Sequence, residues 1–187
     1  MEDWRPVSEV MTRGVIAIHP NAKLADAARL MRENHVSGLP VIGDDDRLVG
    51  IISEMDLVRD LHKAAGIGSA RGILDLLLDS STPGGASIQE VCEARLDRAR
   101  VKELMTRKVA TVTPEEGAAE AARLMRLWKV NRLPVVDVKG RVVGILTRAD
   151  LVHAISGEDR PRTRGRRKPG PVTTAKRPPN SDPYADI

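Results

Sequence analysis

The chain has 187 residues, of which 41% are apolar and 30% are charged, a balance typical of a globular protein. Aromatic residues make up only 2%, which argues against a stacking platform for single-stranded nucleic acid. The single cysteine, Cys92, excludes an internal disulfide and a cysteine-rich zinc site, and we interpret it as a packed thiol. No apolar run approaches the roughly 20 residues that span a bilayer, and the N-terminus lacks the pattern of a signal peptide. We therefore expect a cytoplasmic protein without a membrane segment.

The net charge of +4 belongs to the C-terminal tail. Residues 160–187 hold eight basic and two acidic residues, whereas residues 1–159 hold 22 basic and 24 acidic ones. The composition of residues 157–187, rich in Pro, Gly and Arg, predicts a disordered tail. Its basic stretch either keeps the chain solvated or binds phosphate backbones, so nucleic-acid binding is expected only through residues 160–177.

The body contains an internal repeat with a constant offset of 94 residues. Residues 7–58 and 101–152 align without a gap and are identical at 25 of 52 positions. Chance does not produce such a match, so we interpret the repeat as a duplication. A unit of this size buries too little surface to be stable alone, and two copies can bury their sheet faces against each other.

Each copy predicts the same five elements in chain order. In the first copy, Val15–Ile18 is a short apolar run before Pro20 and predicts a buried strand. Apolar residues at helical spacing predict a helix over Leu24–Met31. Two strands follow, Leu39–Ile42 and Leu48–Ile52, joined by an acidic hairpin turn. A second helix begins at Ser53.

The second copy repeats this order. The matching elements are a strand at Val109–Val112, a helix over Ala118–Met125, a hairpin turn at Lys139–Gly140 and a last helix from Thr147. The order β-α-β-β-α, occurring twice, predicts a mixed α/β (α+β) fold. The expected domains are residues 7–62 and 101–156.

The segment between the copies, residues 63–100, predicts helices and loops. Gly72–Leu78 and the segment from Ser87 are predicted helices, the second opening on a capping box of Ser87 with Glu90. We interpret the segment as a helical linker that packs on the repeats. The alternative is a lid or partner-binding patch centred on Leu76–Leu78.

A hydroxyl followed three residues later by an aspartate recurs where each last helix begins, as Ser53 with Asp56 and Thr147 with Asp150. Such a pair caps a helix by accepting hydrogen bonds from free backbone N–H groups. A carboxylate at this place can also accept the hydroxyls of a ribose, with the helix N-terminus favouring a phosphate. From the pattern alone both roles stay open.

No catalytic arrangement is evident. The four histidines have no metal-ligand spacing, and we assign surface or capping roles to them: His19, His35, His62 and His153. No Gly-rich phosphate loop of known pattern is present. We therefore predict neither an enzyme nor a metal site.

The order and duplication of these motifs resemble a tandem pair of cystathionine-β-synthase-type (CBS) domains. The resemblance covers roughly residues 5–155 apart from the segment between the copies. It rests on the following residues and their copies 94 positions later: Met11-Thr12, Pro20, Ala27–Met31, Leu39–Val41, Val49–Ile51, Ser53 and Asp56. It implies a pseudo-symmetric pair with two clefts, which in many members bind adenosine ligands such as AMP, ADP, ATP or S-adenosylmethionine.

The resemblance also implies which residues line each cleft. Asp150 and Thr147 would hold ribose and phosphate, and Arg132 would meet the phosphate. The residues that would border the adenine of that cleft are Val36, Ser37, Gly38, Ile18 and His19. The other cleft would use Asp56, Ser53, Val130, Asn131 and the strand edge at Thr111. Only the Asp150 cleft has an arginine at its position, so it is the expected better site.

These implications favour a regulatory sensor that has no required cofactor. It would bind an adenosine nucleotide, form a homodimer and signal to an unknown protein partner. Two alternatives remain open. One is a nucleic-acid-associated protein that acts through its basic tail. The other is a dimeric scaffold that binds no small molecule and associates through Trp128 and Leu76–Leu78.

Overall fold

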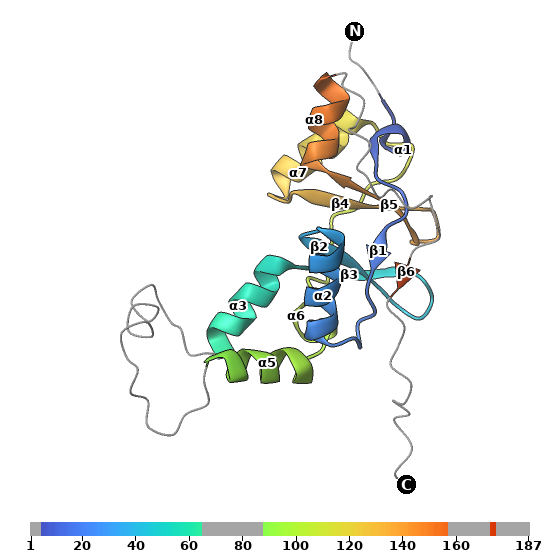
Figure 1. Cartoon of the computed structure of the whole chain (residues 1–187). Helices are drawn as coiled ribbons and strands as arrows, with labels where there is room; N and C mark the ends of the chain where they lie inside the picture. The colour runs from blue at the N-terminus through green and yellow to red at the C-terminus, as the bar shows by residue number, and fades with distance from the viewer. Residues whose placement is uncertain (1–4, 65–87, 157–172, 175–187) are drawn as a thin grey trace. The chain divides into compact units, whose positions relative to one another are not determined.

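The computed structural model describes residues 5–64, 88–156 and 173–174 (Figure 1). The mixed α/β class predicted from the sequence is confirmed. The predicted helix over Gly72–Leu78 and the Ser87 cap lie outside the described residues. In chain order the described elements are α1 (Val7–Val10), β1 (Ile16–Ala17), α2 (Leu24–Asn34), β2 (Gly38–Ile42), β3 (Leu48–Ser53), α3 (Glu54–Ala64), α5 (Ile88–Arg98), α6 (Val101–Leu104), α7 (Ala118–Leu127), β4 (Arg132–Val136), β5 (Val142–Thr147), α8 (Arg148–Ser156) and β6 (Thr173–Thr174).

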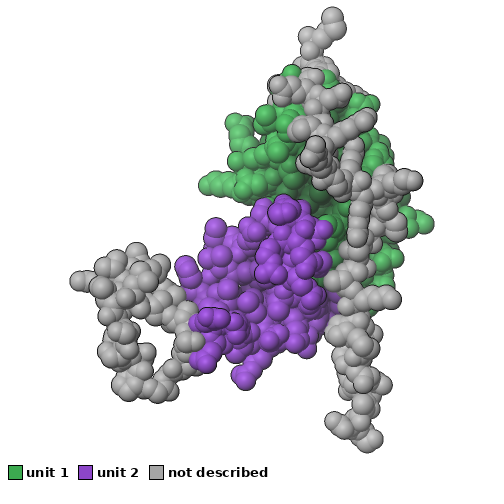
Figure 2. Space-filling model, viewed as in Figure 1, with its two compact units in different colours: residues 1–18, 40–51, 106–174 green, residues 19–39, 52–105, 175–187 purple. Residues whose placement is uncertain are grey.

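The chain divides into two compact units, shown in green and purple in Figure 2. Unit 1 comprises residues 1–18, 40–51 and 106–174, and unit 2 comprises residues 19–39, 52–105 and 175–187. Unit 1 therefore contains the second copy from Thr106 onward, together with α1, β1 and most of β2 and β3. Unit 2 contains the helices α2 and α3 of the first copy together with α5 and α6.

Unit 1 is built on the antiparallel pair β4–β5, whose register places Arg132 opposite Thr147. The helices α7 and α8 contact each other and the strands, and α1 contacts α7, α8 and β5. These elements share one apolar core, composed of Val7, Val10, Met11, Val112, Ala121, Met125, Leu133, Val135, Leu146 and Leu151. Since three of these side chains precede residue 12, the N-terminal segment is part of the core of the second copy.

Unit 2 is a cluster of helices. The helix α2 buries Leu24, Ala27 and Met31, which lie at helical spacing along one face and form the stripe predicted from the sequence. It contacts α3 and α5, and α3 in turn contacts α5 and α6. The described helix of the segment between the copies thus packs on the first copy, as the linker interpretation predicts, while Leu76–Leu78 lie outside the described residues.

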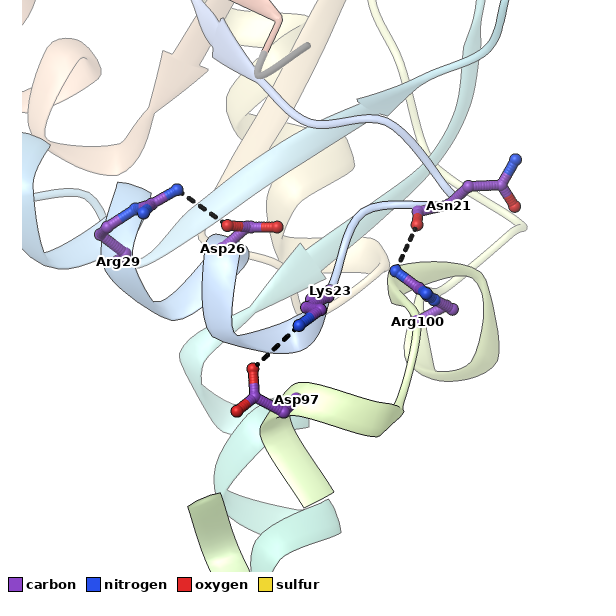
Figure 3. A network of polar contacts seen from close by, with 6 residues as sticks. All are labelled: Asn21, Lys23, Asp26, Arg29, Asp97 and Arg100. Atoms are coloured by element: carbon purple, nitrogen blue, oxygen red, sulfur yellow. Dashed lines mark hydrogen bonds and ion pairs between the residues drawn. The ribbon is translucent and has the colours of Figure 1, made fainter. Parts of the chain in front are cut away.

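Ion pairs hold α5 against its neighbours. Arg95 of α5 donates two hydrogen bonds to the carboxylate of Asp60 on α3, at 2.7 and 3.0 Å, and its guanidinium lies 3.7 Å from Glu103 of α6. Figure 3 shows a second set of contacts at the start of α2, where Lys23 pairs with Asp97 of α5 at 3.2 Å. The helix α5 is therefore fixed to three neighbouring segments of unit 2.

The two copies exchange their first helices. In unit 1, the N–H of Val7 in α1 donates to the carbonyl of Glu116 in the second copy. In unit 2, the N–H of Val101 in α6 donates to the carbonyl of Ala22 in the first copy. Both donors and both acceptors are related by the 94-residue offset. The helix that begins each repeat therefore packs on the other repeat, an exchange that the sequence did not predict.

The hairpin turns agree with the prediction. In the first copy the N–H of Gly43 donates to the carbonyl of Arg47, and Asp46 adopts a positive φ of 60°. In the second copy the N–H of Asp137 donates to the carbonyl of Arg141, and Gly140 has a φ of 78°, which glycine adopts without steric cost. The strands β2 and β3, and β4 and β5, are thereby joined as expected.

One predicted strand differs between the copies. Val15–Ile18 contains the strand β1, but Val109–Val112 contains only an isolated parallel bridge from Val112 to Val135. Copy one has the matching bridge, from Ile18 to Val41. It also has a second partner, the two-residue strand β6, which lies within the tail predicted to be disordered. The remaining tail residues lie outside the described part of the chain.

Candidate functional site

The hydroxyl and aspartate of the second copy meet at the N-terminus of α8. The carboxylate Oδ2 of Asp150 accepts a hydrogen bond from the N–H of Thr147 at 2.8 Å, and the N–H of Asp150 donates to Oγ1 of Thr147 at 3.3 Å. Asp150 is 92% buried, since its relative exposure is 8%. This reciprocal pair confirms the capping role, and it fixes a carboxylate beside the positive end of a helix dipole.

Arg132 and Asn131 lie next to this cap. Arg132 is the partner of Thr147 in the β4–β5 register, so both side chains are on the same face of the pair. The carbonyl of Asn131 accepts a hydrogen bond at 3.1 Å from the N–H of Arg148, the first residue of α8. A cation, a hydroxyl and a carboxylate are thus gathered at one end of unit 1, a combination suited to phosphate and ribose groups.

The first copy presents a related arrangement in unit 2. Oδ2 of Asp56 accepts hydrogen bonds from both the N–H and the hydroxyl of Ser53, at 2.9 and 2.7 Å. The carbonyl of Ser37 accepts the N–H of Glu54 at 3.2 Å, which corresponds to the Asn131–Arg148 bond. Gly38, buried at the start of β2, occupies the position of Arg132. The first copy therefore has the cap and lacks the cation at that position.

The backbone just before β2 and the backbone just before β4 make equivalent hydrogen bonds to the preceding helices. The N–H of Val36 donates to the carbonyl of Met31, and that of Val130 donates to the carbonyl of Met125, both at 3.0 Å. The residue before each valine has a positive φ, 53° at His35 and 54° at Lys129. His35 ends α2 in this conformation, which confirms its predicted position at a helix end.

Ile18, His19 and Thr111 lie near the ends of the predicted first strands. Ile18 is fully buried, and its N–H and C=O both bond to residues of β2. The ring Nδ1 of His19 accepts the N–H of Asn21 at 3.2 Å, a turn-capping contact. Thr111 is partly buried and precedes the bridge residue Val112. The N–H of Ile18 is therefore already used, whereas its carbonyl oxygen has a second lone pair that could accept a hydrogen bond from a ligand.

The structure brings the predicted residues together in two groups. Unit 1 gathers Asp150, Thr147, Arg132 and Asn131, and unit 2 gathers Asp56, Ser53, Ser37 and Gly38. The pairing of Asp150 with Val36–Gly38 in one cleft, and of Asp56 with Val130–Asn131 in the other, stays a prediction.

Gly144, which lies three residues before Thr147 as Gly50 does before Ser53, has a packing role. A Cβ on Gly144 would overlap Sδ of Met11 and would lie 3.2 Å from the carbonyl oxygen of Thr12. The backbones of Thr12 and Ile145 bond to each other in both directions at 2.9 Å. Of the two roles that a glycine in this strand suggests, close approach of a neighbour or of a ligand, the structure supports the neighbour. The sequence could not name it, because Met11 belongs to the other repeat.

A family model for the CBS domain matches the chain twice, over residues 7–63 and 101–157. The chain belongs to the CBS domain family. The resemblance drawn from the repeated motifs is therefore confirmed, and the match to both copies shows a tandem CBS pair.

Relatives of the chain include proteins of similar and of greater length. The uncharacterized protein MJ1426 of Methanocaldococcus jannaschii is 34% identical over 80% of this chain and 90% of its own. The chloroplastic CBS domain-containing protein CBSX1 of Arabidopsis thaliana is 32% identical over 79% of this chain, which spans 63% of that relative. Among solved structures, CBSX2 in complex with AMP is 30% identical with a TM-score of 0.59, covering 81% of this chain and 96% of its own.

No helix among the described residues is long and apolar enough to cross a membrane.

Proposed function

We propose that this CBS pair is a regulatory protein that binds an adenosine nucleotide, with AMP as the first ligand to test. The observation that carries the proposal is the capped carboxylate of Asp150 beside Thr147, with Arg132 in register on the same strand pair. The structurally similar CBSX2 was solved with AMP, which supports a ligand of this class. Binding rather than catalysis is proposed because, within the described part of the chain, we find no acid–base or nucleophilic arrangement beside these residues.

The ribose and the phosphate of the ligand would contact different side chains of unit 1. The Asp150 carboxylate, held in place by the bond from the Thr147 N–H to Oδ2, would accept ribose hydroxyls. The Arg132 guanidinium would contact the phosphate, which the N-terminus of α8 also favours. In the first copy, Gly38 occupies the position equivalent to Arg132 and supplies no cation. We therefore expect the site at Asp56 to bind a nucleotide more weakly than the site at Asp150.

Bound ligand is proposed to change how the chain associates with a second copy of itself or with another protein. A ligand shifts such an equilibrium only by its different affinity for the two states. Mass measurement by light scattering, with and without AMP, will show whether a homodimer forms and responds to the ligand. The family alone does not identify the partner, since one domain serves many outputs.

The variant Asp150→Asn separates the two roles of the carboxylate. The amide oxygen of asparagine can still accept the Thr147 N–H, so the helix cap is retained, whereas the charge that favours ribose hydroxyls is lost. We expect AMP affinity, measured by titration calorimetry, to fall about tenfold, as for loss of one charge-assisted hydrogen bond. The matched variant Asp56→Asn should leave this binding step nearly unchanged.

Arg132→Gln provides the phosphate control in the same titrations. It should weaken AMP binding and leave adenosine binding unchanged, because adenosine has no phosphate. Equal weakening of both ligands would contradict the assignment of Arg132. If AMP, ADP, ATP and S-adenosylmethionine all fail to bind the unmodified protein, the nucleotide proposal is wrong. The dimeric scaffold and the nucleic-acid-associated protein acting through its basic tail would then be the functions to test.

A further inference from the structure

A strand from the C-terminal tail lies along β1. The two residues of β6 pair with β1 in parallel, Thr173 with Ile16 and Thr174 with Ala17 (Figure 1). The two strands are separated by 155 residues of sequence, 18 to 172, and belong to the same compact unit. Threonine is β-branched and suits a strand, whereas the surrounding tail is dominated by Pro, Gly and Arg. The tail therefore contains a two-residue strand that pairs with the edge of β1.

The second copy shows what β1 is like without such a partner. Ala110 and Thr111 occupy the positions of Ile16 and Ala17, 94 residues later, and the structure assigns no strand there. Both copies keep the inner parallel bridge, at Ile18–Val41 and at Val112–Val135. In both copies this segment therefore pairs with the following strand on one edge. Its other edge has a strand partner, β6, in the first copy alone among the described residues. Of the two equivalent segments, Ile16–Ala17 and Ala110–Thr111, only the one that pairs with β6 forms a strand.

The segment that β6 contacts connects the sheet core to a predicted ligand residue. Val15 and Ala17 are buried, at 4% and 0% exposure, in a cluster with Ile42 and Val142. Ile18 follows immediately, and its N–H and C=O are bonded to β2. A partner on the outer edge of β1 therefore restrains the backbone that positions Ile18.

We propose that docking of Thr173–Thr174 orders β1 and thereby strengthens binding of the adenosine ligand, an inference that rests on the proposed function. Coupling between two binding events is reciprocal, so the ligand holds the tail on β1 to the same degree. Loss of ligand would then weaken the pairing of Thr173–Thr174 with β1.

The test compares four forms of the protein: the full chain, residues 1–156, the double variant Thr173→Pro/Thr174→Pro, and Thr163→Pro. Proline has no N–H to donate to a strand partner and is excluded from a paired position. The double variant keeps every charge of the tail, so it separates strand docking from attraction between basic residues and the nucleotide. Thr163→Pro introduces a single threonine-to-proline change ten residues before the paired segment.

Two measurements are made on each form. Amide hydrogen exchange of residues 15–18 reports docking, and calorimetric titration with AMP reports ligand affinity. We expect the truncation and the double variant to exchange faster at β1 and to bind AMP about fivefold more weakly, the lower end of typical coupling. The Thr163→Pro variant should match the full chain in both measurements.

Each other outcome overturns a defined part of the inference. Unchanged exchange at β1 in the double variant would show that the tail does not dock there in solution. Faster exchange with unchanged AMP affinity would show docking without coupling. Weaker binding in the truncation alone would assign the effect to tail charge instead. If the full chain binds no AMP, the proposed function fails, while the exchange data still decide whether β6 docks.

Discussion

At the scale of single residues, aspartates hold several turns and helix starts of this protein in place. Asp137 receives the backbone N–H groups of Lys139 and Arg141, both at 2.9 Å, and pairs with the Arg141 guanidinium. These contacts, the backbone bond from Arg141 first, hold the pKa of Asp137 below its ordinary value. The ionised carboxylate therefore stabilises the turn between β4 and β5.

We predict that this contribution is lost in acid. Because the folded-state pKa of Asp137 is lowered, its stabilisation is fully present above the unfolded-state pKa and disappears as pH falls through the folded one. Asp137→Asn keeps an oxygen for the backbone N–H groups and removes the charge. Urea unfolding should find the variant less stable than the parent at neutral pH and equal to it in acid. A stability difference that persists unchanged in acid would show that the charge is not responsible.

How well a contact could be predicted from the sequence depends on how far apart its residues lie in the chain. The caps by Asp56 and Asp150 could be predicted because both partners lie within one turn of sequence. The pairing of Arg132 with Thr147 could be predicted only through the hairpin register. The contact of Gly144 with Met11 could not, because it joins residues of different repeats that no local pattern relates.

At the scale of elements, α5 depends on one arginine. Arg95 is only one-third exposed and bonds bidentately to Asp60, which raises the pKa of its guanidinium. Bidentate pairs of this kind have better geometry than ordinary surface ion pairs. The segment between the copies is therefore held to α3 through a defined contact and not only through apolar packing.

Replacement of Arg95 should loosen α5 specifically. We expect Arg95→Ala to lower the free energy of unfolding by about 1 kcal/mol and to raise amide exchange in residues 88–98. Arg98→Ala, at an exposed position of the same helix, provides the matched control and should do neither. If both variants behave alike, the Asp60 pair does not hold the helix.

Prediction succeeded for most elements and failed for the shortest. Helices α2 and α7 have apolar residues at helical spacing, and the strands β2–β5 border turn residues, so their patterns are long enough to recognise. The four-residue helices α1 and α6 span barely one turn, which leaves no periodicity to detect. The strand expected at Val109–Val112 has no outer partner among the described residues, and strand structure depends on pairing as well as on sequence.

At the scale of the whole molecule, the exchange of α1 and α6 makes each repeat complete the fold of the other. Val7 and Val101 are equivalent positions and are both fully buried. Val7 lies in the core shared with α7 and α8, whereas Val101 bonds to Ala22 before α2. Damage to the start of one repeat should therefore appear in the other.

Two matched variants test this exchange of first helices. Val7→Ala should destabilise the protein by about 2 kcal/mol, as expected for a cavity in a core, and should speed amide exchange in α7 and α8. Val101→Ala should have a similar cost and speed exchange in α2 and α3. If each variant instead affects the helices of its own repeat, the exchange of first helices is not present in solution.

The exchange of first helices also bears on how such a protein could arise. A single repeat would carry a helix with no site of its own to occupy, together with an empty site for that helix. Two copies of such a molecule would satisfy each other by trading helices, as in domain swapping, and would form a symmetric dimer. The backbone pairings related by the 94-residue offset are consistent with that history. Joining the two genes would then have converted an encounter between molecules, dependent on concentration, into a property of one chain.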